Sequence, residues 1–274
     1  MNNTQTVEKI TLTSLPQAPF TMIKVEGGTF DMGSNERENE KPIHKVRLDD
    51  FWMAEFQVTQ RLWQAVMGNN PSRFKGEMQP VENVSWDDIC TDTENYECFL
   101  TKINRIFAEE LQQNGLPYLQ FRLPSEVQWE YAARGGKLGN ELGHNKCRYA
   151  GSNLLEEVAW YDKNSNGGTM PVGMKMPNAL GLYDLSGNVW EWCRDFYAEK
   201  YYEYCNKFLT KNEICVNPIL ESENISNLEI SDYSVLRGGS WDNFARDNYR
   251  VANRDRLNSD NRINLTGCRL VLFV

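Results

Sequence analysis

Leu236-Arg237-Gly238-Gly239-Ser240-Trp241 opens the C-terminal stretch that decides the fold, and Gly267-Cys268-Arg269-Leu270-Val271-Leu272-Phe273 closes it. Both ends are short and apolar, so we expect strands there, and the paired glycines allow unusual torsions or a close backbone approach. Between them Asn, Asp and Arg dominate, which predicts loops. A polar segment held between two core strands forms a surface platform, and loops on a rigid scaffold commonly carry binding.

The polar middle of this stretch has a repeating organisation. Adaptable residues come in threes and fours between the framing groups 245–246, 250–254 and 260–262, in which Asn, Asp and Arg recur. We expect the framing groups to anchor the loops, because Asn and Asp bond to nearby backbone and Arg makes forked contacts. The adaptable positions would then face solvent and bind a ligand; the alternative is a solvated loop with no partner. They are Asp242, Asn243, Phe244, Asp247, Asn248, Tyr249, Asp255, Arg256, Leu257, Asn258, Ile263, Asn264 and Leu265.

The residue types at these positions predict how a ligand would be held. Apolar side chains such as Phe244, Tyr249 and Leu257 would be the energetic anchors of an interface. Charged side chains such as Asp255 and Arg256 would orient the ligand and match its charge. The pattern therefore favours recognition of another macromolecule, in particular a protein.

The composition indicates one globular domain over residues 1–274, with 41% hydrophobic and 12% aromatic residues. The formal charge is −9 and no cluster of Lys and Arg stands out, so we expect neither nucleic acid nor an anionic membrane as partner. No window approaches the roughly eighteen apolar residues of a membrane span, and residues 1–17 lack the charged start and apolar run of a signal peptide.

The cysteines do not form a disulfide framework. They are seven in number, scattered and too sparse for a chain of this length, so we expect buried free thiols. Cys205 and Cys215 could still close a loop, and both alternatives stay open. No C-x-x-C spacing occurs and His44 and His144 are the only histidines, so a zinc site is not expected.

Residues 20–33 predict two short strands around Gly27-Gly28, and residues 44–54 predict another. Three helices with recognisable ends follow. Thr59 and Gly68 bracket the first, over residues 60–67. A capping box at residues 85–88 starts the second, which we expect to continue past residues 91–93 to Gly115. A second capping box, at residues 125–128, starts the third, and the third ends at Gly135-Gly136.

Two further segments lack regular periodicity. Residues 137–177 are rich in Gly, Asn, Asp and Ser, which is typical of a functional or closely packed loop. Residues 197–235 begin with four tyrosines, contain few apolar positions and resemble an insertion. No repeat or linker composition divides the chain, so we expect a single domain that carries insertions.

Short motifs recur along the chain in a characteristic order, at residues 30–33, 58–59, 63–72, 80–81, 84–86, 122–126, 129–135, 177–178, 181–184, 187–192 and 237–241. In this order they resemble the formylglycine-generating-enzyme (sulfatase-modifying factor) family from about Met22 to the C-terminus. The resemblance implies the family's irregular variant of the C-type lectin fold, an α+β architecture with many loops.

Fold does not settle function, because one fold hosts many sites. The enzymes of the family resemble one another in two cysteines just beyond the Arg-Gly-Gly-Ser motif, which bind copper and activate oxygen. Alignment on Arg237-Gly238-Gly239-Ser240-Trp241 places Asn243 and Asn248 at those positions. Copper(I) needs thiolate ligands, which amides cannot replace, and the remaining cysteine of this region, Cys268, lies on the expected terminal strand. We therefore expect no catalysis.

The chain also resembles a second group on the same scaffold, the variable proteins of diversity-generating retroelements. In these proteins a C-terminal segment, here 236–274, is rewritten by error-prone copying of template adenines. An AAC or AAT codon, which encodes Asn, can yield Asp, Tyr, Phe, Leu, Ile, Arg and others when changed only at its adenines, but never Trp, Met, Lys, Glu or Gln. All thirteen adaptable positions lie in the permitted set.

The family resemblance also implies a calcium site, at positions that here hold Asp184, Gly187, Val189 and Glu191. Two carboxylates and two backbone carbonyls, completed by water, are ligands that calcium accepts. The alternative is structural: Asp184 caps a turn and Glu191 pairs with an arginine.

Together these observations predict a monomeric ligand-binding protein that needs no cofactor, calcium being the open case. Its variable C-terminal surface would bind a macromolecular ligand, and the resemblance favours the cell surface over the cytoplasm. Two alternatives remain: an oxidoreductase of the formylglycine-generating type, and a structural adaptor.

Overall fold

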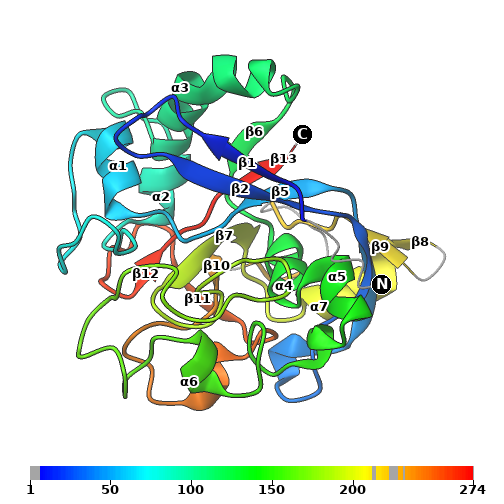
Figure 1. The fold of residues 1–274 in the computed structure, drawn as a ribbon. Helices are drawn as coiled ribbons and strands as arrows, with labels where there is room; N and C mark the ends of the chain where they lie inside the picture. Colours follow the sequence, from blue (N-terminus) through cyan, green and yellow to red (C-terminus); the bar gives the residue numbers. More distant parts are fainter. Residues whose placement is uncertain (1–6, 212–213, 222–227, 231, 274) are drawn as a thin grey trace, which may run out of the picture.

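In the part of the chain that the structure describes, three β-sheets built from strands far apart in the sequence form the framework (Figure 1). The computed structural model describes residues 7–211, 214–221, 228–230 and 232–273. The strands are β1 Lys9–Leu12, β2 Phe20–Val25, β3 Gly28–Met32, β4 His44–Leu48, β5 Phe51–Ala54, β6 Gln120–Arg122, β7 Trp190–Phe196, β8 Thr210–Lys211, β9 Ile214–Val216, β10 Tyr233–Arg237, β11 Asp255–Asn258, β12 Thr266–Gly267 and β13 Val271–Phe273.

The first sheet joins the two ends of the described chain. Its order is β1-β2-β5-β13-β6, and every neighbouring pair is antiparallel. The last strand, β13, thus lies between β5 and β6, and Val271 and Leu272 are fully buried. The prediction of an apolar terminal strand in the core is confirmed.

The second sheet, of order β11-β10-β7-β12, carries the C-terminal stretch. β10 ends at Arg237, and β11 runs antiparallel to it with Leu236 opposite Asp255. The prediction that the middle of the stretch is entirely loop is therefore wrong. β7 pairs with one edge of β10, and the backbone groups on the other edge form hydrogen bonds with residues 255–258.

The third sheet, of order β3-β4-β9-β8, includes strands from residues 197–235. β9 pairs in parallel with β4, with Val46 opposite Cys215. Tyr201 and Tyr202 of this segment are buried in the main core cluster. Part of the segment expected as an insertion therefore contributes to the core.

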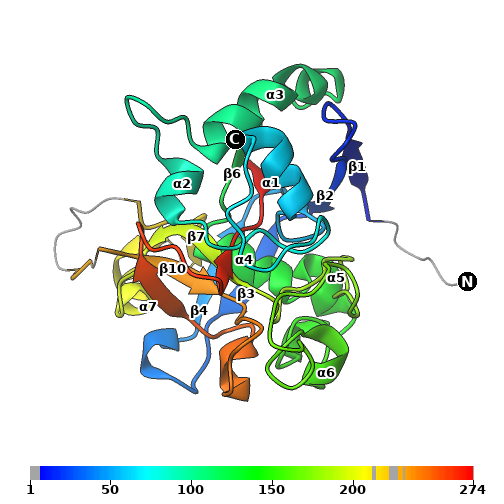
Figure 2. The same cartoon turned by 90° about the vertical axis from the view of Figure 1, so that its left-hand side faces the viewer.

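The helices surround these sheets, and Figures 1 and 2 place α1, α2 and α3 together at one end and α6 at the other. No helix of the described residues combines the length and apolar character needed to cross a membrane. The helices are α1 Gln60–Met67, α2 Trp86–Cys90, α3 Phe99–Gln113, α4 Glu126–Ala133, α5 Gly136–Glu141, α6 Leu155–Val158 and α7 Tyr201–Tyr204, with short helical turns η1 Glu38–Glu40, η2 His144–Lys146, η3 Cys205–Leu209 and η4 Arg246–Tyr249.

The predicted helix ends are confirmed at most positions. The Thr59 side chain accepts from Leu62 N, and both capping boxes, at residues 85–88 and 125–128, are complete. The second helix, however, is divided, because α2 ends at Cys90 and α3 begins at Phe99. Asp92 separates them: its carboxylate accepts from the backbone N of Cys98 and the hydroxyl of Thr101, the start of the new helix.

Candidate ligand-binding surface

Residues 242–265, here called the display segment, are fastened to the body of the protein by buried arginines. The Arg254 guanidinium makes a two-pronged contact with Glu126, Nε to Oε1 at 2.7 Å and Nη2 to Oε2 at 2.8 Å. Arg250 does the same with Glu40, at 2.9 and 2.7 Å. All four side chains are buried, so these ion pairs fix the course of residues 250–254 from beneath.

Arg237, at the end of β10, connects Glu126 and a further buried carboxylate, Glu130, to the display segment. Its guanidinium donates to Glu126 Oε1 at 3.3 Å and Glu130 Oε2 at 2.6 Å, and also to the backbone oxygens of Val251 and Ala252 at 2.7 and 3.2 Å. Burial works against the charge of Arg237, but nearby groups, Glu130 and Glu126 among them, raise its pKa. The Arg237 guanidinium therefore stays protonated within the core.

The other predicted framing groups behave differently. Arg262 makes a fork to Asp88, Nε to Oδ2 at 2.7 Å and Nη2 to Oδ1 at 2.6 Å, at an exposed position beside α2. Ala245 and Arg246 are exposed, so the prediction that they anchor the loop is wrong. Two of the three framing groups thus hold the segment, one in the core and one at the surface.

The thirteen predicted binding positions divide into three classes of exposure. Exposed are Asp242, Phe244, Asp247, Asp255, Arg256 and Asn258; half-buried are Asn243, Asn248, Leu257, Ile263, Asn264 and Leu265; Tyr249 is buried. The prediction that Tyr249 is displayed is therefore wrong. Its hydroxyl lies 2.9 Å from Ser240 O and 2.7 Å from Asn243 O, and its ring packs 6.0 Å from that of Tyr161.

Several of the half-buried positions also serve the framework. Asn243 Oδ1 accepts from the backbone N of Ser240 at 2.7 Å and closes the turn after the glycine pair. Leu257 and Leu265 pack against a core cluster. The one large apolar side chain among these positions that is freely displayed is Phe244, which is 81% exposed.

The structure arranges the display segment in two connected parts. Residues 242–249 lie next to Arg148, which pairs with Asp247 at 2.7 Å. Residues 255–265 run along β10 and α2, where Ser259 O accepts from Asp87 N. The Trp241 indole joins the parts by donating to Asn264 O at 2.8 Å.

A recess of about 550 Å³ opens beside β11. The Arg256 guanidinium lies over the Tyr197 ring at 4.5 Å and within 5.8 Å of the Tyr233 ring centre. Sequence spacing does not predict this recess, because its walls come from stretches far apart in the chain; the tyrosines near residue 200 are the available signal. Its lining is Tyr197, Ala198, Glu199, Lys200, Leu228, Glu229, Ile230, Tyr233 and Arg256.

Comparison with known proteins shows to which family this chain belongs. A model described as sulfatase-modifying factor enzyme 1-like domain matches residues 10–273. The chain belongs to this family. Treponema denticola variable protein 1 is a similar solved structure, with a TM-score of 0.71 and 27% identity, covering 97% of this chain and 99% of that one. The fold is the formylglycine-generating-enzyme type of C-type lectin fold, α+β and rich in loops, as the motifs predicted.

Two relatives show the range of the sulfatase-modifying factor family. Chaperone protein LppX of Paenibacillus barcinonensis is 33% identical over 211 residues, which cover 65% of this chain and 72% of that protein. The formylglycine-generating enzyme of Thermomonospora curvata is 26% identical over 243 residues, again 65% of this chain and 72% of that protein. The family thus includes enzymes together with proteins that carry other names.

The predicted calcium residues come together in this family member. Three backbone oxygens, those of Asp184, Gly187 and Val189, converge with the carboxylate of Glu191 around the side chain of Gln57. The Asp184 carboxylate does not face Gln57, because its Oδ2 accepts from Gly173 N at 2.8 Å; the calcium site itself stays a prediction.

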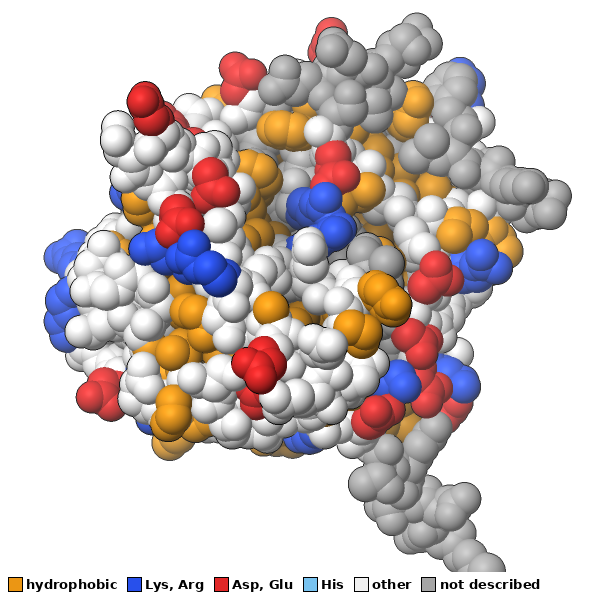
Figure 3. Space-filling view, turned by 90° about the horizontal axis from the view of Figure 1, so that it is seen from above, with side chains coloured by type: hydrophobic (Ala, Val, Ile, Leu, Met, Phe, Trp, Pro, Cys, Tyr) orange, Lys and Arg blue, Asp and Glu red, His pale blue; other side chains and the backbone are white. Residues whose placement is uncertain are grey.

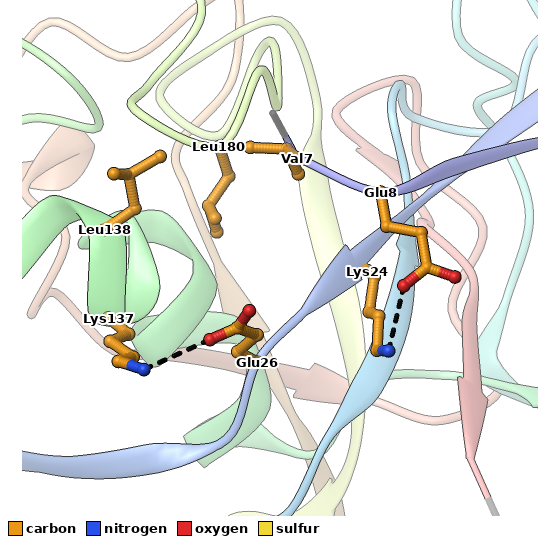
Figure 4. Close-up of a pocket in the computed structure, with 7 residues that line it drawn as sticks. All are labelled: Val7, Glu8, Lys24, Glu26, Lys137, Leu138 and Leu180. Atoms are coloured by element: carbon orange, nitrogen blue, oxygen red, sulfur yellow. Dashed lines mark hydrogen bonds and ion pairs between the residues drawn. The ribbon is translucent and has the colours of Figure 1, made fainter. Parts of the chain in front are cut away.

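Two other surface features lie apart from the display segment. A cavity of about 150 Å³ is lined by two ion pairs, Lys24–Glu8 at 2.9 Å and Lys137–Glu26 at 3.3 Å, together with three apolar side chains (Figure 4). Its four charged side chains are already paired with one another. On the face in Figure 3, the described Lys and Arg side chains lie in small groups, several beside acidic ones.

The buried carboxyl of Asp195 predicts a pH dependence of stability. Burial, followed by the charge of Glu126, raises the Asp195 pKa to about 7. Its folded pKa exceeds the unfolded value of about 3.9, so its stabilising contribution is present at low pH and is lost as pH rises through 7. Between pH 5 and pH 8 we expect wild type to lose about 2–3 kcal/mol relative to Asp195→Asn.

Urea denaturation of both proteins at the two pH values measures this difference. Asn keeps the shape of the side chain but loses one acceptor, for Glu126 N or Leu220 N, and that loss is the same at both pH values. Parallel pH profiles for the two proteins would contradict the prediction.

Proposed function

We propose that this protein is a ligand-binding, receptor-like protein whose display segment recognises a macromolecule, specifically a protein. The observation that carries the proposal is that one short segment contains both buried anchoring residues and solvent-exposed residues. Arg250 and Arg254 are locked in the core, whereas six positions between and beside the anchors project into solvent. A framework fixed from beneath leaves the exposed side chains free to vary without loss of fold.

The exposed positions have the chemistry of a protein-binding site. Phe244 offers an aromatic anchor, and Asp242, Asp247, Asp255 and Arg256 supply charge of both signs. The recess beside Arg256 could accept one protruding side chain of the ligand, which gives residues 197–200, residues 228–230 and Tyr233 a share in recognition. Similarity to Treponema denticola variable protein 1 over nearly the whole chain supports a variable, recognition role.

Two matched libraries test the proposal. One randomises the six exposed positions, and the other randomises six buried ones, residues 249–254. Displayed on yeast and challenged with protease, the first library should stay mostly folded and the second should be cleaved. Selection of the first library on a panel of purified proteins should then yield binders. A first library that unfolds as readily as the second would contradict the proposal.

Diversification by a retroelement is part of the same proposal and has its own test at the level of DNA. We expect a near-duplicate of the segment that encodes residues 236–274, close to a reverse transcriptase gene. That copy should carry AAC or AAT at the twelve adaptable positions that are exposed or half-buried. Uniform sequences at 242–265 among close relatives, with no such copy, would favour the adaptor alternative.

The second candidate function is an oxidoreductase of the formylglycine-generating type, because the family includes such enzymes. The positions aligned with the copper-binding cysteines hold Asn243 and Asn248, whose side chains bond to Ser240 and Arg37. Amide groups do not fit copper(I), which needs soft thiolate ligands. Tight copper(I) binding, or oxygen consumption with a cysteine-containing peptide, would establish the enzyme and overturn the binding proposal.

We place this receptor at the cell surface as a monomer. Protease treatment of intact cells should remove it, and light scattering should give the mass of one chain. A protected protein or a stable dimer would contradict these two points without affecting the binding proposal.

A further inference from the structure

Gln57, which follows β5, is a buried side chain on which four oxygens converge. Its Nε2 lies 3.1 Å from Asp184 O, 3.3 Å from Gly187 O, 3.1 Å from Val189 O and 3.1 Å from Glu191 Oε1. A carboxamide nitrogen has only two hydrogens, so this donor faces twice as many acceptors as it can serve fully. Such a cluster of oxygens around one point is the arrangement that usually surrounds a cation.

The oxygen set does not fit calcium here, because the Gln57 amide occupies its centre and the Arg269 guanidinium balances the charge of Glu191. Calcium would sit about 2.3–2.6 Å from its oxygens, in the space that Gln57 Nε2 occupies. The Glu191 carboxylate is engaged by the Arg269 guanidinium at 2.9–3.2 Å and by the Trp129 indole at 2.8 Å. The Asp184 carboxylate is not one of the four oxygens around Gln57 Nε2, and its Oδ2 accepts from Gly173 N at 2.8 Å.

We infer that the Gln57 carboxamide, together with Arg269, replaces the metal ion that this oxygen cluster would otherwise require. The amide supplies hydrogens to the converging carbonyls, and the guanidinium supplies the positive charge opposite Glu191. Arg269 also ties the cluster to other segments, because it donates to the backbone oxygens of Ala54, Glu55 and Tyr183. We call this arrangement the amide lock.

The amide lock holds the base of the display segment. Gly187 N donates to Gly238 O, and Trp241 N donates to Asn188 O, so the loop of the lock is bonded to both sides of the Gly238-Gly239 pair. Glu191 lies opposite Arg237 in the second sheet. Ligand recognition by the display segment is therefore independent of calcium; this consequence rests on the proposed function, whereas the lock itself does not.

The experiment compares wild type, Gln57→Ala and Gln60→Ala, each melted with calcium and with a chelator. Gln60 is the matched control, a buried glutamine whose Nε2 donates to two carbonyls, Phe74 O and Pro80 O, outside the lock. We expect the wild-type melting temperature to change by less than about 1 °C. Both variants should melt roughly 5–10 °C lower, and calcium should recover several degrees for Gln57→Ala alone.

The outcomes separate the inference from its competitors. A wild-type protein that binds one calcium ion in equilibrium dialysis, or melts earlier in chelator, would overturn the lock, because Gln57 would then be a ligand. If calcium changes the melting temperature of neither variant, the inference is also overturned, because the oxygens around residue 57 would then not be able to bind a cation. If Gln57→Ala does not fold, the wild-type dialysis decides alone. None of these measurements involves the macromolecular ligand of the display segment, so their failure would not affect the proposed function.

Discussion

Arg254→Ala is expected to lower the free energy of unfolding by about 3–5 kcal/mol, because it leaves Glu126 charged in the core without its fork partner. Arg237 would remain as a single 3.3 Å contact to Glu126, too little to replace two bonds. The backbone oxygen of Asn39 would also lose the bond from Arg254, whereas that of Ala198 would keep its bond from Tyr201 N. Urea denaturation followed by circular dichroism measures the loss.

Arg262→Ala is the matched control for this prediction. Arg262 makes the same kind of fork, to Asp88, but its side chain is 55% exposed. Water screens that pair, so the expected loss is at most about 1 kcal/mol. Equal losses for the two variants would mean that the buried forks do not fix the display segment. If Arg254→Ala is not recovered as soluble protein, Arg254→Lys, which keeps the charge but loses the fork, should fall between the two.

Tyr249→Ala is expected to cost about 3–5 kcal/mol of stability, because it opens a cavity beneath the display segment. The ring is fully buried and contacts the turn that follows β10, where a Cβ added at Gly239 would lie 2.7 Å from it. Tyr249→Phe keeps the ring and removes the hydrogen bond to the turn, so it should cost about 1 kcal/mol.

Phe244→Ala is the control at an exposed position and should change stability by less than about 0.5 kcal/mol. Thermal melts of the three variants at one pH give the comparison. A Phe244→Ala variant that melts as early as Tyr249→Ala would show that Phe244 packs inward, and the proposed binding surface would lose its aromatic anchor.

Local features of the sequence predicted local structure correctly. Thr59, Ser85 and Ser125 start helices because each side chain accepts a backbone N–H three residues ahead, a contact that needs no other part of the chain. The apolar run that ends at Phe273 predicted a core strand for a similar reason, since such residues are stable only when buried.

Predictions about the orientation of single residues in the display segment were less accurate. Tyr249 and Phe244 occur in similar Asn- and Asp-rich surroundings, yet one is buried and the other is exposed. An irregular segment has no fixed period, so sequence spacing does not tell which side chain points inward. The acceptors of its arginines, Glu40 and Glu126, lie far away in the chain, and no local pattern pairs them.

By itself the sequence determined the family, the helix ends, the terminal strand and the stretch that carries the candidate binding residues. Each of these depends on contacts between near neighbours or on a motif with a set spacing. Only the tertiary structure decided which of those residues face solvent, that Arg250 and Arg254 are anchored on buried carboxylates, and that Gln57 fills the centre of the oxygen cluster. These features depend on side chains brought together from segments more than a hundred residues apart, and their energies follow from burial, which exists only once the chain has folded.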